Sequence, residues 1–255
     1  MTMFQNKVAL VTGGGLGMGA SAALLFGTRG AAVAVADLNE GHAQRVADLI
    51  KSKGGKAIAI KADITSEADN ARMFEETKAA FGGIDYAFLN AGAVQAYRPF
   101  EEMTLETFDK MIALNLRGPY LGVRECLKHL RPGGAAVVNA STAGILGFAD
   151  AGGYSSAKHG ALGLVKSATR AFADKKLRIN AVCPGQIATP LNGAPQDDTI
   201  LPPEQLPVPE DRGLMSAQHV AEVVLFLLSP AAAGVNGQAQ LVDAALLSAF
   251  PPLNL

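Results

Sequence analysis

Short apolar and β-branched runs alternate along the chain with longer segments in which apolar residues recur at helical spacing. The short runs predict strands over residues 7–12, 31–37, 56–62, 84–90, 134–140, 177–183 and 238–242. Helical spacing predicts helices over residues 17–29, 40–53, 66–81, 104–129, 152–173 and 216–228. Strands that alternate with helices imply a parallel sheet with helices on both faces. We therefore expect one doubly wound, seven-stranded α/β domain that spans residues 1–255.

One stretch, residues 189–213, interrupts this alternation. Regular structure is forbidden over most of its length by six prolines, namely Pro190, Pro195, Pro202, Pro203, Pro207 and Pro209. A loop this long inside a compact domain is usually functional. After the last predicted strand, residues 243–255 are predicted to form a C-terminal tail.

Composition narrows the range of partners. The formal net charge of −1 and the absence of a basic block make nucleic acid and membrane surfaces poor partners. Charged residues make up 18% of the chain, below the ~25% typical of soluble domains, which indicates buried subunit contacts. The N-terminus lacks a signal-like pattern and no apolar run approaches ~18 residues, so we expect a soluble, cytoplasmic protein.

The cysteines and histidines suggest no special chemistry. Cys126 and Cys183 are too few for a disulfide framework, so we expect buried free thiols. The four histidines show no ligand spacing with one another or with the cysteines, and we expect no metal site.

A glycine-rich turn follows the first predicted strand. Residues 13–19 read GGGLGMG, and a good helix former, residues 20–25, comes directly after them. Glycines allow a tight turn and a close backbone approach to a pyrophosphate, which then faces the free N–H groups of the helix. The pattern predicts a site for a dinucleotide.

A second pattern indicates acid/base chemistry. Tyr154 and Lys158 are four residues apart on a predicted helix, and Ser141 follows a predicted strand. Positions i and i+4 lie on one helix face, so the Lys158 ammonium can stand beside the Tyr154 phenol and favour its phenolate. Each residue also has an ordinary structural alternative: a turn serine, a surface tyrosine or a solvated lysine.

The two patterns together resemble the short-chain dehydrogenase/reductase family, from Lys7 to about Val242. The resemblance rests on Thr12-Gly13-x-x-x-Gly17-x-Gly19 with Ser141, Tyr154 and Lys158. It implies a Rossmann-type fold, a nicotinamide cofactor, and a substrate-binding role for the loop at 189–213. It also adds to the case for a homotetramer. Three positions depart from the family pattern: Leu89 replaces the usual Asn, and Ala244-Ala245 replaces Gly-Gly.

Asp37 bears on the choice of cofactor. It ends the second predicted strand, where a carboxylate can accept hydrogen bonds from both adenosine ribose hydroxyls and would repel the 2′-phosphate of NADP. Leu38 follows it, and the glycine turn carries no Arg or Lys, so the sequence favours NAD. A strand-end turn residue or a helix cap is the alternative interpretation of Asp37.

The resemblance places the remaining cofactor contacts. It implies that Asp63 and Ile64 meet the adenine, although a turn or cap role for Asp63 is nearly as well supported. Further contacts are implied for Gly13, Gly15, Leu16, Gly17, Met18, Asn90, Ala91, Gly92, Tyr154, Lys158, Pro184, Gly185, Ile187 and Thr189.

The resemblance also assigns catalytic roles. Tyr154 would give a proton to a carbonyl oxygen or take one from a hydroxyl, and Ser141 would hydrogen-bond that oxygen. Lys158 would lower the pKa of Tyr154 and bind the nicotinamide ribose. Asn115 would hold a water that links Lys158 to solvent, or it is simply a satisfied core amide.

We expect hydride transfer between NAD and a small neutral secondary alcohol or ketone. The substrate would contact Ser141, Tyr154, Gln95 and Gln186, among apolar or uncharged neighbours such as Tyr97 and Leu191. An NADPH-dependent 3-oxoacyl thioester reductase and a non-catalytic NAD(P)-sensing regulator remain alternatives. A nicotinamide-dependent epimerase or dehydratase is a third alternative, although such relatives usually need a larger substrate domain.

Overall fold

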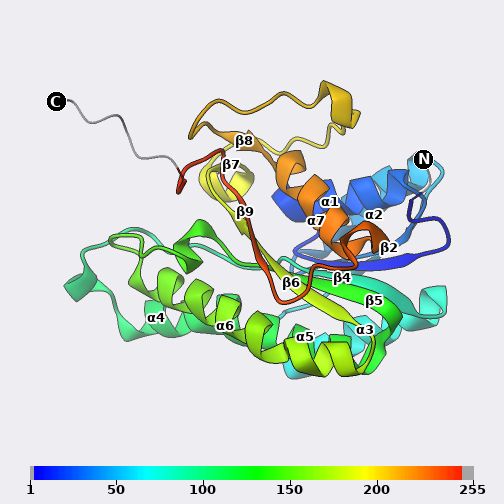
Figure 1. The fold of residues 1–255 in the computed structure, drawn as a ribbon, viewed down its shortest axis with the longest axis horizontal. Coiled ribbons are helices and arrows are strands. Elements are labelled where there is room, and N and C mark those ends of the chain that lie inside the picture. The colour runs from blue at the N-terminus through cyan, green and yellow to red at the C-terminus, as the bar shows by residue number, and fades with distance from the viewer. Residues whose placement is uncertain (1–2, 249–255) are drawn as a thin grey trace.

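A seven-stranded parallel sheet forms the centre of the computed structural model, which describes residues 3–248 (Figure 1). The strand order is β3-β2-β1-β4-β5-β6-β9. The strands are β1 Val8–Thr12, β2 Ala32–Asp37, β3 Lys56–Lys61, β4 Ile84–Leu89, β5 Leu130–Asn139, β6 Arg178–Pro184 and β9 Ala239–Val242. The predicted doubly wound parallel sheet is confirmed.

Helices cover both faces of this sheet, as Figure 1 shows. One layer holds α1 Gly17–Thr28, α2 Glu40–Ser52 and α7 Ala217–Leu228. The other holds α3 Glu67–Phe81, α4 Leu105–Ile112, α5 Gly118–His129 and α6 Gly152–Asp174. Each layer packs its own apolar core against the sheet, and β1 and β4 are buried at every residue. Burial on both faces explains why these strands read as continuous apolar runs rather than alternating ones.

The topology determines where a ligand can bind. From β1 the chain moves outward through β2 to β3 and then crosses back to β4 on the other side of β1. In open parallel sheets, ligands bind outside the carboxyl ends of the strands at such a reversal. The glycine turn after β1 and the segment after β4 meet there.

The predicted helix over residues 104–129 is interrupted. It consists of α4 and α5 joined by a π-helical segment, Ala113–Arg117, in which Asn115 is buried. Single π turns inside helices often occur at functional sites. Hydrophobic periodicity cannot reveal such a segment, because both flanks keep the helical pattern.

The loop at 189–213 is largely irregular, as predicted, but it is anchored. Short 3₁₀ turns occur at Pro190–Asn192 and Pro203–Gln205, and a two-stranded sheet of β7 Ile187–Ala188 and β8 Met215–Ser216 closes its base. The sequence analysis did not predict these two strands, which are too short for an alternation signal.

The C-terminal segment has an unusual backbone at Ala244-Ala245. Ala244 and Ala245 both have positive φ, at 48° and 63°. This left-handed conformation suits glycine and is strained for alanine. The tail predicted over residues 243–255 is described only to residue 248, and its last seven residues lie outside the described range.

Candidate active site

The glycine turn packs directly against the segment that follows β4. Gly13 has a φ of +58°, and a Cβ there would lie 2.9 Å from the Ala91 Cα. The turn leads into α1, whose N-cap residue Leu16 offers no side-chain hydrogen bond. The first N–H groups of a helix have no partner within the helix and suit a phosphate group, although Gly17 N here donates to a loop side chain. The backbone of the turn therefore fits the pyrophosphate of a dinucleotide.

Asp37 lies at the same turn and serves two backbone groups. Its Oδ2 accepts from Gly15 N at 3.0 Å, and its Oδ1 accepts from Asn39 N at 2.9 Å. Leu38 beside it is 65% exposed. The turn role considered for Asp37 is thus present, and its predicted contact with the adenosine ribose stays a prediction.

A cation that the linear sequence did not place at the turn is Arg45 of α2. Its Nη2 donates to the Gly15 carbonyl at 2.7 Å, and its Nη1 pairs with Asp198 from the 189–213 loop. The glycine turn itself carries no Lys or Arg, but the fold brings Arg45 to it. Asp198 offsets that positive charge.

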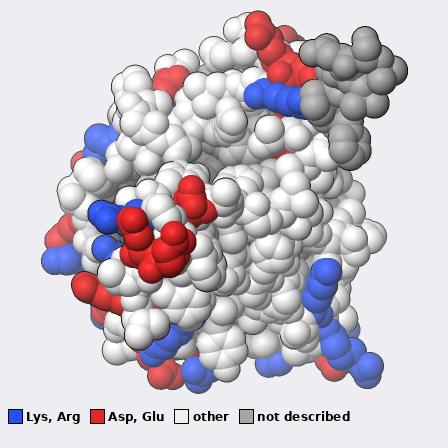
Figure 2. Space-filling view, turned by 90° about the vertical axis from the view of Figure 1, so that its left-hand side faces the viewer, with Lys and Arg blue, Asp and Glu red and all other residues white. Residues whose placement is uncertain are grey.

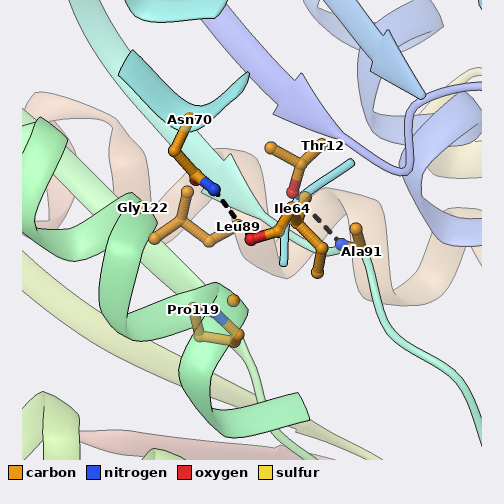
Figure 3. Close-up of a pocket in the computed structure, with 8 residues that line it drawn as sticks. Thr12, Ile64, Asn70, Leu89, Ala91, Pro119 and Gly122 are labelled. Atoms are coloured by element: carbon orange, nitrogen blue, oxygen red, sulfur yellow. Dashed lines mark hydrogen bonds between the residues drawn. The ribbon is translucent and has the colours of Figure 1, made fainter. Parts of the chain in front are cut away.

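A small pocket opens between the carboxyl ends of β1 and β4 and helices α3 and α5 (Figure 3). Ile64 and Ala91, both predicted cofactor contacts, line it together with Thr12 and Leu89. Thr12 Oγ1 accepts from Ala91 N at 3.1 Å, and Asn70 Nδ2 donates to the Ile64 carbonyl at 2.7 Å. Both bonds hold the segments after β3 and β4 in place.

Asp63 has the turn role that the sequence left open. Its Oδ1 accepts from both the backbone N and the Oγ1 of Thr65, each at 2.8 Å. These bonds fix the turn after β3 just before α3, and the predicted adenine contact stays a prediction.

Asn90 still makes hydrogen bonds to the glycine turn, although Leu89 replaces the usual Asn before it. Asn90 Nδ2 donates to the carbonyls of Thr12 and Gly13, both at 3.1 Å, and its Oδ1 accepts from Asn139 Nδ2 at 3.0 Å. Leu89 instead fills the space beside Gly122, where a Cβ would lie 2.8 Å from Leu89 Cδ2. Leu89, which departs from the family pattern, is thus accommodated by its contact with Gly122.

Ser141, Tyr154 and Lys158 come together at the carboxyl end of β5 and the start of α6. The Ser141 hydroxyl lies near enough to the Tyr154 phenol to act on its pKa. Ser141 Oγ also accepts from Ala143 N at 3.0 Å, which fixes the hydroxyl. The Lys158 Nζ lies 5.6 Å from the centre of the Tyr154 ring. The three side chains therefore form the cluster that their spacing predicted.

Burial shifts the pKa values of this cluster. It raises the pKa of Tyr154 above its usual value, and the hydrogen bond from Ser141 works against that increase. Burial lowers the pKa of Lys158 to about 8. The predicted lowering of the Tyr154 pKa by Lys158 stays a prediction.

Asn139, which the sequence analysis missed, holds Lys158. Its backbone carbonyl accepts from Lys158 Nζ at 2.7 Å, while its side chain bonds Asn90. Its Oδ1 is one of the few buried side-chain oxygens without a partner among the described residues. One signal in the sequence could have identified Asn139: it is an amide residue at the end of a predicted apolar strand, two residues before Ser141.

Asn115 is committed to the protein backbone. Its Nδ2 donates to the Ala93 carbonyl at 2.9 Å and its Oδ1 accepts from Ala93 N at 3.3 Å. Gly92 lies so close that a Cβ there would be 2.6 Å from that Oδ1. Asn115 therefore holds the segment after β4, as expected for the alternative that it is a hydrogen-bonded amide of the core. Its water-holding role stays a prediction.

The segment after β6 approaches the glycine turn. Thr189 is buried, and its methyl group lies where a Cβ on Gly17 would meet it at 3.1 Å. Pro184 and Gly185 sit beside β9, and Gly185 N donates to the Val242 carbonyl at 2.9 Å. Ile187 is buried, while Gln186 is exposed. Beyond them, Gln196 Oε1 accepts from Gly17 N at 2.8 Å, so the loop touches the start of α1.

Gln95, predicted to contact substrate, is buried and bonded to helix α6. Its Oε1 accepts from the backbone N of Tyr154 at 2.9 Å. The predicted neighbours Tyr97 and Leu191 are exposed, and so is Ile145. Figure 2 shows a mostly uncharged face on the side where α4 lies in Figure 1.

Sequence comparisons connect this geometry to known enzymes. A family model described as enoyl-(acyl carrier protein) reductase matches residues 14–245. Cyclohexanol dehydrogenase of Acinetobacter sp. is 40% identical over 250 residues, with 96% of each chain covered. Levodione reductase of Leifsonia aquatica is 35% identical, covering 98% of this chain and 97% of the relative. Cis-4-hydroxycyclohexanecarboxylate dehydrogenase of Sinomonas cyclohexanicum is also 35% identical, covering 94% and 96%.

Solved structures give the same picture. The crystal structure of levodione reductase matches with a TM-score of 0.87 at 32% identity, covering 97% of this chain and all of that one. A 3-ketoacyl-(acyl-carrier-protein) reductase from Brucella melitensis complexed with NADH matches at 0.82 and 29% identity, covering 94% and 98%. A short-chain dehydrogenase from Burkholderia cenocepacia in complex with NADP matches at 0.83 and 28%, with the same coverage. Its glycine turn, its Ser141-Tyr154-Lys158 cluster and these likenesses over nearly the whole length show that the chain is an oxidoreductase of the short-chain dehydrogenase/reductase family.

Proposed function

We propose that this enzyme transfers hydride between NAD(H) and a small neutral secondary alcohol or ketone in which the reacting carbon belongs to a six-membered ring. The observation that carries the proposal is the cluster in which Ser141 acts on the pKa of the Tyr154 phenol and the buried Lys158 ammonium lies 5.6 Å from the centre of the same ring. A non-catalytic cofactor sensor would have no need of this cluster.

Each side chain has one role in the proposed reaction. Tyr154 holds the proton that its Oη gives to the carbonyl oxygen in reduction, or takes from the hydroxyl in oxidation. Ser141, fixed by Ala143 N, donates to the same oxygen and orients the reacting carbon. When bound, the nicotinamide supplies or accepts the hydride. Lys158, held by the Asn139 carbonyl, would bind the nicotinamide ribose.

The preference for NAD rests on Asp37. Its carboxylate lies at the glycine turn, where it accepts from Gly15 N, and a 2′-phosphate near it would be repelled. Arg45 brings a positive charge to the same turn, which by itself would favour NADP. Because Asp198 pairs with Arg45, we propose that the repulsion from Asp37 prevails.

The substrate class follows from the relatives and the lining of the site. The names of the relatives specify cyclohexanol, levodione and a hydroxycyclohexanecarboxylate. Side chains near the site that the substrate could meet, such as Tyr97, Ile145 and Leu191, are uncharged and at least partly exposed. An uncharged ring fits such a lining better than an anionic thioester carrier does.

We propose that the enzyme is a homotetramer. On α4 and α5, Leu105 is 80% exposed and Tyr120 is 48% exposed in the single chain. Large apolar side chains in such positions mark protein contacts when they gather. Multi-angle light scattering at micromolar concentration should give about four times the 26.3 kDa chain mass, and a monomeric mass would refute the assembly.

A substrate panel tests the reaction and the substrate class together. Cyclohexanol and its substituted ketones would be compared with acyclic secondary alcohols and with a 3-oxoacyl thioester, each with both cofactors, by absorbance of the reduced nicotinamide. The proposal predicts the highest kcat/KM for a cyclic substrate with NAD(H). A preference for the thioester with NADPH would replace it with the reductase alternative.

No helix within residues 3–248 combines the length and apolar character that crossing a membrane requires.

A further inference from the structure

Helix α6 begins without a cap of its own, and Tyr154 lies in its first turn. The helix starts at Gly152, and its N-cap residue Ala151 has no side chain that accepts a hydrogen bond. The first N–H groups of any helix lack partners within the helix. The residue that carries the proposed proton donor is therefore in a turn that depends on outside contacts.

Those contacts come from the segment between β4 and α4. Tyr154 N donates to Gln95 Oε1 at 2.9 Å, and Gly153 N donates to Met103 Sδ at 3.3 Å. The carboxamide of Gln95 also points its Nε2 at the same Met103 sulfur, 3.6 Å away. Two side chains far away in sequence thus take the place of a local helix cap.

Gln95 is fixed in that position. It is 6% exposed, and the backbone of Ala93, two residues earlier, is clamped on both its N and its carbonyl by Asn115. Gly153 allows the close approach, since a Cβ there would lie 2.9 Å from Gln95 Oε1. Hydrogen bonds therefore connect the π segment between α4 and α5, through residues 93–95, to the backbone of Tyr154.

We propose that Gln95 is a positioning residue that sets the Tyr154 phenol against Ser141, and this inference rests on the function proposed above. Two glycines precede Tyr154 in the helix, so no side chain of these two residues helps to fix the first turn. A misplacement of about 1 Å at a reacting group costs on the order of 100-fold in rate. The oxygen of Gln95 thus serves the Tyr154 backbone rather than the substrate.

Two substitutions separate positioning from general stability. Gln95→Leu removes the acceptor with little change in size, and kcat should fall about tenfold or more while the Kd for NADH stays within twofold. Gln95→Glu keeps an acceptor at the helix start, where the helix dipole favours a carboxylate. It should retain at least a third of the maximal kcat.

The pH profile supplies a readout that a merely structural role would not move. The added charge of Gln95→Glu lies at the backbone N of Tyr154 and disfavours phenolate on the same residue, so the pH-rate curve for alcohol oxidation should shift to higher pH by about half a unit or more. Gly153→Ala, whose methyl would press on Gln95 Oε1, should reproduce the loss seen in Gln95→Leu. Gln44→Leu, on the exposed side of α2, is the matched control and should change nothing.

Hydrogen exchange tests the contact without turnover. In Gln95→Leu, the amides of residues 153–155 should exchange about tenfold faster than in the wild type, while the rest of α6 is unchanged. If the wild type oxidises no alcohol, the proposed function fails, and this exchange experiment still decides whether Gln95 holds Tyr154. The inference is overturned if Gln95→Leu keeps more than half of the wild-type kcat, if Gln95→Glu lowers the rate without a pH shift, or if the exchange is unaltered.

Discussion

Because Lys158 is buried, we predict that replacing it raises the free energy of unfolding and lowers the activity. Its side chain is 3% exposed as part of the core, and burial lowers its pKa to about 8 from an ordinary value of 10.5. Each pKa unit corresponds to about 1.4 kcal/mol, so keeping Lys158 charged at pH 7 costs the folded state about 3 kcal/mol. Lys158→Met removes that cost and keeps the aliphatic volume.

One contact opposes the gain. Lys158 Nζ donates to the Asn139 carbonyl at 2.7 Å, and losing that bond costs about 1 to 2 kcal/mol. The net expectation at pH 7 is that Lys158→Met unfolds with a free energy about 1 to 2 kcal/mol higher than the wild type. Turnover should fall at least 100-fold in the same variant, since Tyr154 and the nicotinamide ribose lose their shared partner.

The sign of the pH dependence sharpens the test. The folded pKa lies below the unfolded pKa, so between about pH 8 and 10.5 the unfolded chain holds more protons. The contribution of Lys158 to wild-type stability therefore rises with pH through that window. Burial raises the pKa of the Cys183 thiol to about 11, so the contribution of Cys183 to stability falls as the pH rises. Because this thiol is present in both proteins, its effect largely cancels when their free energies of unfolding are subtracted.

Urea unfolding of both proteins at pH 7 and pH 10 measures this difference. The advantage of Lys158→Met should shrink by about 2 to 3 kcal/mol between the two pH values and can reverse. Lys166→Met, at an exposed position of the same helix, should change stability by less than about 0.5 kcal/mol. A difference independent of pH would refute the conclusion that burial depresses the Lys158 pKa.

Three further predictions concern the cofactor turn and the C-terminal segment. Asp37→Ala with Leu38→Arg should move the ratio of kcat/KM values toward NADP by about 100-fold, and an unchanged ratio would reduce Asp37 to a turn residue. Asp198→Asn should release the Arg45 charge and raise kcat/KM for NADP relative to NAD about threefold or more, while Asp197→Asn, one residue away, should not alter the ratio. Ala244→Gly with Ala245→Gly should raise the free energy of unfolding by about 1 kcal/mol, because both alanines have positive φ; a loss of stability would show that their methyl groups contribute packing.

Local sequence patterns predicted the sheet and most helices because burial on both faces gives β1 and β4 unbroken apolar runs. They also identified Ser141, Tyr154 and Lys158 as one cluster, since a strand end and an i,i+4 helix pair restrict where these side chains can point. The structure shows that they meet.

Contacts between segments far apart in sequence were beyond such patterns. Arg45 reaches the glycine turn from α2, Asn139 holds Lys158 through a backbone carbonyl, and Gln95 caps a helix that begins 57 residues after it. In each case the partner is a backbone group, which every residue has and no sequence pattern marks. The π segment at Asn115 was missed because it keeps the spacing of a helix on either side.

The central claim is that Tyr154 exchanges the proton with the substrate oxygen, and Tyr154→Phe tests it most directly. The substitution keeps the ring, whose centre lies 5.6 Å from Lys158 Nζ, and removes only the hydroxyl on whose pKa Ser141 acts. With cyclohexanol and NAD, the account predicts a fall in kcat of at least about 100-fold with an unchanged Kd for NADH. A variant that keeps more than a tenth of the wild-type rate would contradict the account.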